Sequence, residues 1–322
     1  MRAVFLDYET ISYSDLGTAS LMRVIPTLRL YDNTTESQLI ERIEHAEIVL
    51  LNRIKLGRTT LEAATRLQLI AVAGTGTDNI DLAAAEERGV GVCNVRSYCT
   101  PSVAQHAWSM ILYLTQRLPA FRQLVIEGAW AGGASFRGAE LRIRELRGLT
   151  LGIVGWGELG RTVGRIGESF GMRVLAANRH GGAGPPEGKA PQRVLLRELL
   201  AVADIVSLHC PLTDQTRGMI GAAELALMKK DALLINTARG ALIDSGALAA
   251  ALKSGRLGGA GIDVLPQEPP VNADPLQDAA IPNLLVTPHV AWAARESRQR
   301  CLDEMAANIQ DFLSGGRRGR VV

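Results

Sequence analysis

The chain has 322 residues, 47% of them hydrophobic, a length typical of about two globular domains with separate cores. Its 35 Lys and Arg nearly balance its 33 Asp and Glu, which argues against binding to nucleic acid or to a charged membrane surface. The cysteines are scattered without CxxC spacing, and no apolar run is long enough for a secretory or membrane-spanning segment, so the sequence predicts a cytoplasmic protein without a bound metal or disulfides.

Short apolar runs rich in β-branched residues alternate with helical patterns in the first part of the chain. The predicted strands are residues 3–6, 47–51, 69–73 and 91–95. This alternation is typical of a parallel sheet covered by helices. A long helical pattern then begins at Thr100-Pro101, where proline suits the first turn, and continues to Leu118. We expect this helix to carry the chain into a second domain.

A second series of strand and helix patterns follows and is complete without elements from the first. Its predicted strands are residues 149–154, 173–177, 205–209, 233–236, 260–264 and 284–287. Helical patterns begin at Glu158 and cover residues 193–201. Between them, the glycines and prolines of residues 181–186 follow a strand and predict a surface loop.

A polar helical pattern runs from residue 291 to residue 312. Because the second sheet is already complete, this helix is expected to pack against the first domain. The predicted fold class is therefore α/β, with two doubly wound parallel-sheet domains. One comprises residues 1–99 and 291–322, and the other, residues 100–290, is inserted in it.

A glycine turn, Gly155-Trp156-Gly157-Glu158-Leu159-Gly160, joins the first strand of the second domain to its first helix. GxGxxG alone is a weak signal, but a strand before it and a helix after it are typical of a dinucleotide-binding Rossmann unit. Gly155 would permit the tight turn, Gly157 would let a pyrophosphate approach, and Gly160 would allow helix and strand to pack closely. The amides of Glu158 and Leu159 would face the phosphates.

The residue that ends the next strand usually decides between NAD and NADP. An acidic residue there binds the ribose hydroxyls of NAD, whereas this chain has Asn178 followed by Arg179. Arg179 could pair with the 2′-phosphate of NADP, or it could stack on adenine or point to water while Asn178 accepts NAD. NADPH is slightly favoured over NADH.

Three side chains downstream of the glycine turn suit the reduction of a 2-keto acid: Arg239, Glu268 and His289. Arg239 could hold the carboxylate and polarise the carbonyl, and His289 could supply the proton. Glu268, held in a stiff turn by Pro269 and Pro270, could fix the imidazole tautomer. Taken singly, each residue could instead be structural or solvent-facing, so the prediction depends on the ordered set.

Together these motifs resemble the D-isomer-specific 2-hydroxyacid dehydrogenase family over essentially the whole chain. The matching stretches are residues 74–81, 155–160, 206–213 with Thr216, 235–240, 261–264, 268–269 and 287–291. The resemblance implies that Arg239 orients the keto acid, that His289 is the acid/base and that Glu268 is its partner. It also implies that Thr75 and Gly76 offer backbone amides to the substrate carboxylate.

The resemblance also implies a cofactor site, a domain arrangement and an assembly. Asp263 would lie near the nicotinamide carboxamide, and the cofactor would be lined by Cys210, Pro211, Thr216, Thr237 and Ala238. The discontinuous first domain would be a flavodoxin-like substrate domain, and the inserted Rossmann domain would bind NAD(P)H. The cleft would close on binding, and two copies would form a homodimer through the cofactor domain.

Within the family the chain is most similar to the glycerate dehydrogenases, also called hydroxypyruvate reductases. The stretches that carry this similarity are residues 94–96, 102–106, 143–146 and 291–293. They imply reversible reduction of hydroxypyruvate to D-glycerate. Two alternatives stay open: a broad glyoxylate or 2-keto acid reductase, and a non-catalytic, dinucleotide-sensing corepressor, whose relatives keep the same three residues.

Overall fold

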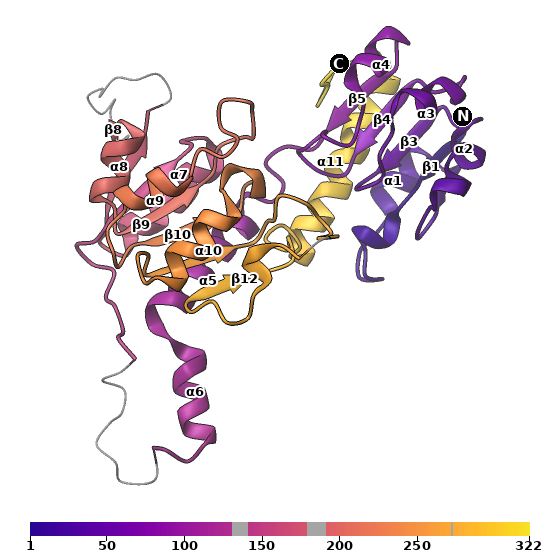
Figure 1. The fold of residues 1–322 in the computed structure, drawn as a ribbon. Helices are drawn as coiled ribbons and strands as arrows, with labels where there is room; N and C mark the ends of the chain where they lie inside the picture. Colours follow the sequence, from indigo (N-terminus) through magenta and orange to yellow (C-terminus); the bar gives the residue numbers. More distant parts are fainter. Residues whose placement is uncertain (131–140, 179–190, 272) are drawn as a thin grey trace. The chain divides into compact units, whose positions relative to one another are not determined.

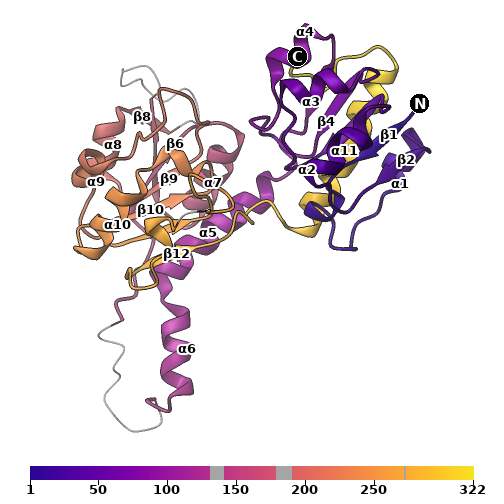
Figure 2. The ribbon, with the colours of Figure 1, turned by 45° about the vertical axis from the view of Figure 1, so that its right-hand side comes forward.

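The computed structural model describes residues 1–130, 141–178, 191–271 and 273–322. The chain forms two compact units, each built on its own sheet (Figures 1 and 2). Unit 1 comprises Met1–Pro101 and Trp292–Val322, and unit 2 comprises Ser102–Ala291. Unit 2 is therefore an insertion between two segments of unit 1.

Unit 1 contains a five-stranded parallel sheet in the order β2-β1-β3-β4-β5. Its strands are β1 (Ala3–Phe5), β2 (Leu28–Leu30), β3 (Ile48–Leu51), β4 (Leu69–Val72) and β5 (Gly91–Asn94). This order is that of flavodoxin-like sheets, in which ligands bind beyond the carboxyl ends of the strands where the order reverses. The sequence did not predict β2, because its three residues are too few to show an apolar alternation.

Helices cover both faces of this sheet. They are the 3₁₀ turn η1 (Tyr8–Thr10), α1 (Ala19–Val24), α2 (Glu36–Ile43), α3 (Arg58–Ala63), α4 (Leu82–Glu87) and α11 (Arg295–Leu313). The predicted return helix is confirmed as α11, although it begins at Arg295 and not at residue 291. Its Cys301, Leu302 and Met305 are buried in the core with Phe5 and Leu50 of the sheet.

Unit 2 contains a seven-stranded parallel sheet in the order β12-β11-β10-β9-β6-β7-β8. Its strands are β6 (Thr150–Val154), β7 (Arg173–Ala177), β8 (Gln192–Val194), β9 (Ile205–Leu208), β10 (Leu233–Asn236), β11 (Gly259–Ile262) and β12 (Leu284–Val286). This is a Rossmann arrangement whose order reverses between β6 and β9. The predicted α/β class with two parallel sheets is confirmed.

The helices of unit 2 flank its sheet, apart from α6, which extends away from it (Figure 1). They are α5 (Thr100–Gln116), which starts at the end of unit 1, α6 (Leu118–Ile126), α7 (Glu158–Ser169), α8 (Leu196–Val202), α9 (Ala222–Leu227), α10 (Ser245–Lys253), and the 3₁₀ turns η3 (Gly240–Leu242) and η4 (Pro275–Gln277). Among all the helices described in the two units, none is both long and apolar enough to cross a membrane.

Two predicted helix limits in unit 2 are wrong. The long helix does not continue to Leu118, because Arg117 adopts a left-handed backbone (φ 54°) that ends α5 and starts α6. Residues 193–195 are not helical, because Arg193 and Val194 pair with β7 as part of β8. The next helix, α8, begins only at Leu196. The glycine-rich loop expected at residues 181–186 lies outside the described residues.

Candidate active site

The glycine turn lies between β6 and α7, where the strand order of unit 2 reverses. Gly155 has a φ of +104°, and a Cβ added to it would lie 2.5 Å from the carbonyl carbon of His209. A Cβ on Gly160 would lie 2.1 Å from the carbonyl oxygen of Gly155. By contrast, a Cβ on Gly157 would meet no atom of the described residues within 4 Å. The turn therefore packs tightly on its protein side and leaves space at Gly157, beside the first amides of α7.

Two buried polar atoms on the neighbouring strand ends have no hydrogen-bond partner among the described residues. They are Nδ1 of His209, after β9, and Oγ1 of Thr237, after β10. The other ring nitrogen of His209 bonds to Oγ of Ser207 at 2.8 Å. Burial lowers the pKa of His209 to about 4, so its imidazole is neutral at pH 7. Because buried polar atoms are normally satisfied, these two atoms fit a site completed by a polar ligand such as a dinucleotide.

The other predicted cofactor residues surround this edge of the sheet. Cys210 is partly buried with its Sγ 3.8 Å from Sδ of Met219, and burial raises the pKa of its thiol. The Thr216 hydroxyl donates to the carbonyl oxygen of Pro211 at 2.8 Å and accepts from the Thr213 amide at 2.8 Å, which holds the loop after β9 in shape. Glu158 and Leu159 lie in the first turn of α7.

Of the two residues predicted to distinguish NAD from NADP, the structure describes one. Asn178 follows β7 directly, and its amide donates to the carbonyl oxygen of Val194 at 2.8 Å. Arg179 lies outside the described residues.

Arg239 lies in the loop after β10, and the side chain of Asn236 shapes that loop. The buried Asn236 accepts from the Ala238 amide at 3.0 Å and donates to the carbonyl oxygen of Arg239 at 2.9 Å. Nη1 of Arg239 donates to the carbonyl oxygen of Ala238 at 2.8 Å. The sequence analysis did not predict this role for Asn236, which it included only as part of the matching stretch 235–240.

Gly240 lets two neighbouring loops meet. A Cβ at this position would lie 2.0 Å from the carbonyl carbon of Leu265 and 2.4 Å from the nitrogen of Pro266. The Leu265 amide in turn donates to Oε1 of Glu268 at 2.7 Å. The loop that carries Arg239 therefore packs on the segment that fixes the Glu268 carboxylate.

Glu268 and His289, predicted as partners, are in contact. The second carboxylate oxygen of Glu268 forms a hydrogen bond and ion pair with Nδ1 of His289. About a third of each side chain is exposed, 32% for Glu268 and 37% for His289. With Nδ1 bonded to the carboxylate, Nε2 is the ring nitrogen that can exchange a proton with a ligand.

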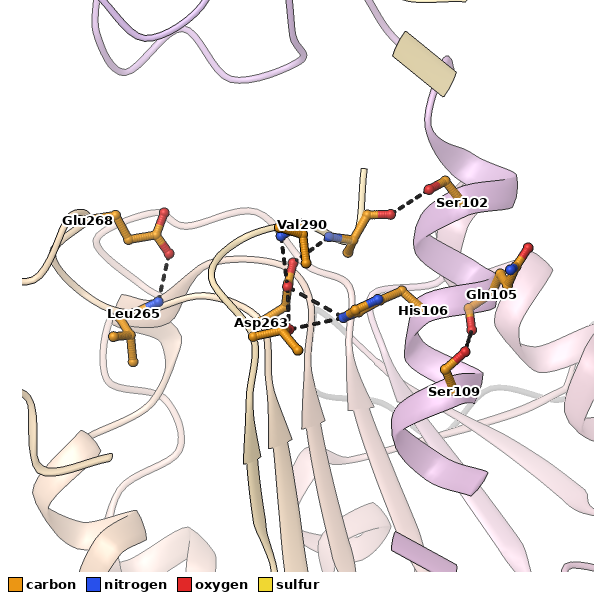
Figure 3. Close-up of polar contacts among 10 residues, drawn as sticks. Ser102, Gln105, His106, Ser109, Asp263, Leu265, Glu268 and Val290 are labelled. Atoms are coloured by element: carbon orange, nitrogen blue, oxygen red, sulfur yellow. Dashed lines mark hydrogen bonds and ion pairs between the residues drawn. The ribbon is translucent and has the colours of Figure 1, made fainter. Parts of the chain in front are cut away.

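Asp263 fixes the loop that carries His289 (Figure 3). Its side chain is 1% exposed; Oδ1 accepts from the Val290 amide at 2.9 Å, and Oδ2 accepts from the Ala291 amide at 2.9 Å. The His289 amide donates to the carbonyl oxygen of Asp263 at 2.7 Å. His289 itself has a φ of +55°, a conformation that persists only where its surroundings enforce it. The contact predicted between Asp263 and nicotinamide stays a prediction.

Thr75 and Gly76, predicted to bind the substrate carboxylate, follow β4 in unit 1. The Thr75 hydroxyl donates to the carbonyl oxygen of Val95 at 2.8 Å, and the Asn94 side chain donates to the carbonyl oxygen of Thr75 at 2.6 Å. These bonds hold the backbone of this turn at the carboxyl ends of β4 and β5. Gly76 is partly buried beside Thr75.

The same edge of unit 1 contains a loop clamp that the sequence did not reveal. The buried carboxylate of Asp7, after β1, accepts from the amides of Asn52 and Arg53 at 2.8 and 2.7 Å. Asn79 donates to the carbonyl oxygens of Asn52 and Ile54 at 3.3 and 2.9 Å. The loop after β3 is thus fixed through both its amides and its carbonyls, at the point where the strand order reverses.

Comparison with known proteins gives one family. The model of the D-isomer specific 2-hydroxyacid dehydrogenase, NAD binding domain, matches residues 108–291. A glycerate dehydrogenase from Methylorubrum extorquens is 39% identical over 98% of this chain and 96% of its own length. A hydroxypyruvate reductase from Blautia hydrogenotrophica is 33% identical over 98% of both chains.

A solved structure has the same fold throughout. The D-lactate dehydrogenase from Aquifex aeolicus, complexed with NAD and lactic acid, superposes with a TM-score of 0.86. It is 29% identical to this chain, and the match covers 100% of this chain and 99% of the other.

Proposed function

Because the chain belongs to the D-isomer-specific 2-hydroxyacid dehydrogenase family, we propose that it transfers a hydride reversibly between NAD(P)H and a small 2-keto acid, and that its principal reaction converts hydroxypyruvate to D-glycerate. The contact between Glu268 and His289, in a loop held by Asp263, is the observation that carries this proposal. The names of the two relatives support the choice of hydroxypyruvate.

His289 is the acid in the direction of reduction. Its Nδ1 is bonded to the Glu268 carboxylate, which orients the ring and leaves Nε2 to deliver the proton to the developing alkoxide. In the direction of oxidation the same nitrogen takes the proton from the hydroxyl group. The Leu265 amide holds Glu268 in place throughout.

Arg239 supplies the fixed cation. Its guanidinium would bind the carboxylate and polarise the carbonyl of the keto acid, so that negative charge developing on the oxygen is stabilised. The backbone amides of Thr75 and Gly76 would bind the substrate carboxylate.

The cofactor supplies the hydride when bound to unit 2. The space at Gly157, the amides of Glu158 and Leu159, and the unpartnered Oγ1 of Thr237 would hold its phosphates and ribose. Gly155, Gly160, Cys210, Pro211, Thr216 and Ala238 would shape the rest of the site, and Asp263 would approach the nicotinamide. NADPH is slightly favoured over NADH because Asn178 has no charge to repel a 2′-phosphate and Arg179 could pair with one.

The decisive experiment is steady-state oxidation of NADPH and NADH in parallel, with hydroxypyruvate or glyoxylate as acceptor. Faster turnover of hydroxypyruvate supports the glycerate-forming reaction, and equal kcat/KM for both acceptors favours the broad reductase. Tight dinucleotide binding without turnover of any 2-keto acid would contradict the enzyme and favour the corepressor-like sensor. Arg179→Ala should weaken NADPH far more than NADH; an equal loss for both would contradict 2′-phosphate recognition.

We further propose that the protein is a cytoplasmic homodimer assembled through unit 2. Figure 1 shows α6 extending away from the sheet of unit 2, and this helix has no buried residue. Its Leu118, Val125 and Ile126 are 65%, 55% and 58% exposed, an apolar surface that a second copy would cover. Light scattering should give a dimer for the native chain and a monomer for Val125→Asp/Ile126→Asp. A native monomer would contradict the proposal.

A further inference from the structure

Helix α5 presents two polar side chains to the loop that carries His289. Ser102 and His106 lie one turn apart and therefore on the same face of the helix. The Ser102 hydroxyl donates to the carbonyl oxygen of Ala291 at 2.6 Å, and Nε2 of His106 lies 3.0 Å from Oγ1 of Thr287 (Figure 3). The helix thus holds both ends of residues 287–291, in whose middle His289 lies.

The hydrogen bonds at Thr287 fix the proton on His106. The Thr287 hydroxyl donates to Oδ1 of Asp263 at 2.5 Å. A hydroxyl has one proton, so Oγ1 of Thr287 must accept from His106, and Nε2 of His106 is protonated. The same nitrogen is 3.5 Å from Oδ1 of Asp263, which adds an electrostatic attraction. His106, Thr287 and Asp263 therefore form one directed chain of donors and acceptors.

This series of hydrogen bonds ends at the Asp263 carboxylate, which fixes the backbone on both sides of His289. Oδ1 of Asp263 accepts from Thr287 and from the Val290 amide, the residues two before and one after His289. The left-handed backbone of His289 is unfavourable for a residue with a Cβ, so it needs contacts of this kind on both sides. Each bond in such a buried network also strengthens its neighbours.

We propose that His106 is a positioning residue for catalysis. Its Nε2–H group holds Thr287 and Asp263 in the arrangement that orients the His289 imidazole toward Glu268 and the reacting oxygen. His106 takes no proton from the substrate and is not an acid or base of the reaction. This inference rests on the proposed function, in which His289 delivers the proton.

The test compares His106→Leu, which keeps the volume but removes the donor, with His106→Gln, whose amide nitrogen can take the place of Nε2. Removing the donor should lower kcat for the keto acid by about 10-fold or more while the dinucleotide dissociation constant stays within about 3-fold. His106→Gln should recover most of the lost kcat. Ser109→Ala is the matched control, because exposed Ser109 donates only to the carbonyl oxygen of Gln105 on the same helix.

A merely structural His106 would give a different result. Both variants would then lower the melting temperature and leave kcat unchanged, or the Gln variant would be no better than the Leu variant; either outcome overturns the proposal. If neither variant folds, Thr287→Ser and Thr287→Val replace them, since only Ser keeps the hydroxyl that links His106 to Asp263.

NMR of ¹⁵N-labelled histidines tests the positioning role of His106 independently of the proposed enzyme function. A protonated Nε2 on His106 and a shift of the His289 ring signals in His106→Leu are expected whether or not any keto acid is reduced. An inactive native protein with these signals would contradict the enzyme function alone. An unprotonated Nε2, or an unchanged His289 signal, would contradict the positioning role alone.

Discussion

The two units use the same device at the carboxyl edges of their sheets. In unit 1 the buried Asp7 follows β1 and accepts from amides of the loop after β3. In unit 2 the buried Asp263 follows β11 and accepts from amides of the loop after β12. In each case a carboxylate just beyond one strand fixes the loop beyond another strand of the same sheet.

The surroundings of the two carboxylates differ. Burial raises the pKa of Asp7, whose carboxylate accepts from the backbone amides of residues 52–54. Asp263 instead has the hydroxyl of Thr287 and the imidazole of His106 beside it. The loop held by Asp7 carries no histidine, whereas the loop held by Asp263 carries His289. The clamp in unit 1 therefore shapes its loop, whereas the clamp in unit 2 shapes the loop that carries His289, the proposed proton donor.

The largest effect on activity is expected from the loss of His289, the side chain that the clamped loop of unit 2 has and that of unit 1 lacks. His289→Ala should lower kcat by roughly 10²- to 10⁴-fold, because the proton donor is lost, and leave dinucleotide binding intact. Stopped-flow and fluorescence titration measure the two quantities. His45→Ala is the matched control: this histidine of unit 1 is 59% exposed and pairs with the adjacent Glu44. Turnover near the native rate for His289→Ala would contradict the role of His289 as the proton donor.

The clamps themselves can be compared by Asp263→Asn and Asp7→Asn. Each change replaces a carboxylate oxygen that accepts from backbone amides by an NH2 group that cannot accept, and should cost about 1–3 kcal/mol of unfolding free energy. Asp263→Asn should also lower kcat at least about 10-fold, whereas Asp7→Asn should act mainly on the KM of the keto acid. Urea unfolding and steady-state kinetics measure these effects. Equal kcat losses would show that both clamps serve the chemical step.

The stability cost of Asp7→Asn should change with pH in a direction that follows from the raised pKa of Asp7. The folded state raises the pKa of Asp7 above 3.8, so the stability that this group contributes is present at low pH and is lost as the pH rises above about 4. The cost of Asp7→Asn should therefore be larger at pH 4 than at pH 7. A cost that grows with pH would contradict burial as the dominant influence on this carboxylate.

Substitution of a glycine beside each of the two sheet edges should also have different effects on stability. Gly240→Ala places a Cβ 2.0 Å from the Leu265 backbone, so it should shift the segment that holds Glu268 and cost about 1–3 kcal/mol together with activity. In unit 1 a Cβ on Gly74 meets nothing within 4 Å, and Gly74→Ala should leave stability within about 0.5 kcal/mol of the native value. Thermal unfolding measures both. A tolerated Gly240→Ala would show that the Glu268 segment can move without loss.

Much of this architecture could be predicted because it depends on periodic or local signals. The strand patterns and the glycine turn gave the two parallel sheets, and the order of Arg239, Glu268 and His289 gave the candidate trio. Glu268 and His289 are in contact, and their catalytic partnership stays a prediction. Local signals of this kind lie within a few residues of one another or recur with a fixed period.

The clamps could not be predicted, because they join residues far apart in the sequence, many of them through backbone atoms. Asp7 holds residues 52–54, and His106 contacts Thr287, 181 positions away. Backbone amides have no residue type to recognise. The break at Arg117 and the strand at residues 192–194 were missed for a related reason, since a left-handed residue and an edge pairing depend on contacts that no short pattern reports.

The smallest expected effect concerns the buried imidazole at the edge of unit 2. The folded pKa of His209 is about 4, below the ordinary value of 6.5, so the unfolded chain binds the extra proton first as the pH falls. The stability that neutral His209 contributes is therefore present above about pH 6.5 and is progressively lost toward pH 4. Between pH 7.5 and 5.5 the loss should be about 1.4 kcal/mol.

His209→Gln isolates this contribution, because glutamine does not titrate and can still bond to Ser207. Unfolding by urea, followed by the fluorescence of Trp108 and Trp156 in unit 2, should show a smaller difference between pH 7.5 and 5.5 in the variant than in the native chain. His45→Gln, in unit 1, should show the native difference because that ring is exposed. If His209→Gln also keeps the native difference, burial does not lower the pKa of His209 in the folded protein, and the proposed cause of this pH dependence is wrong.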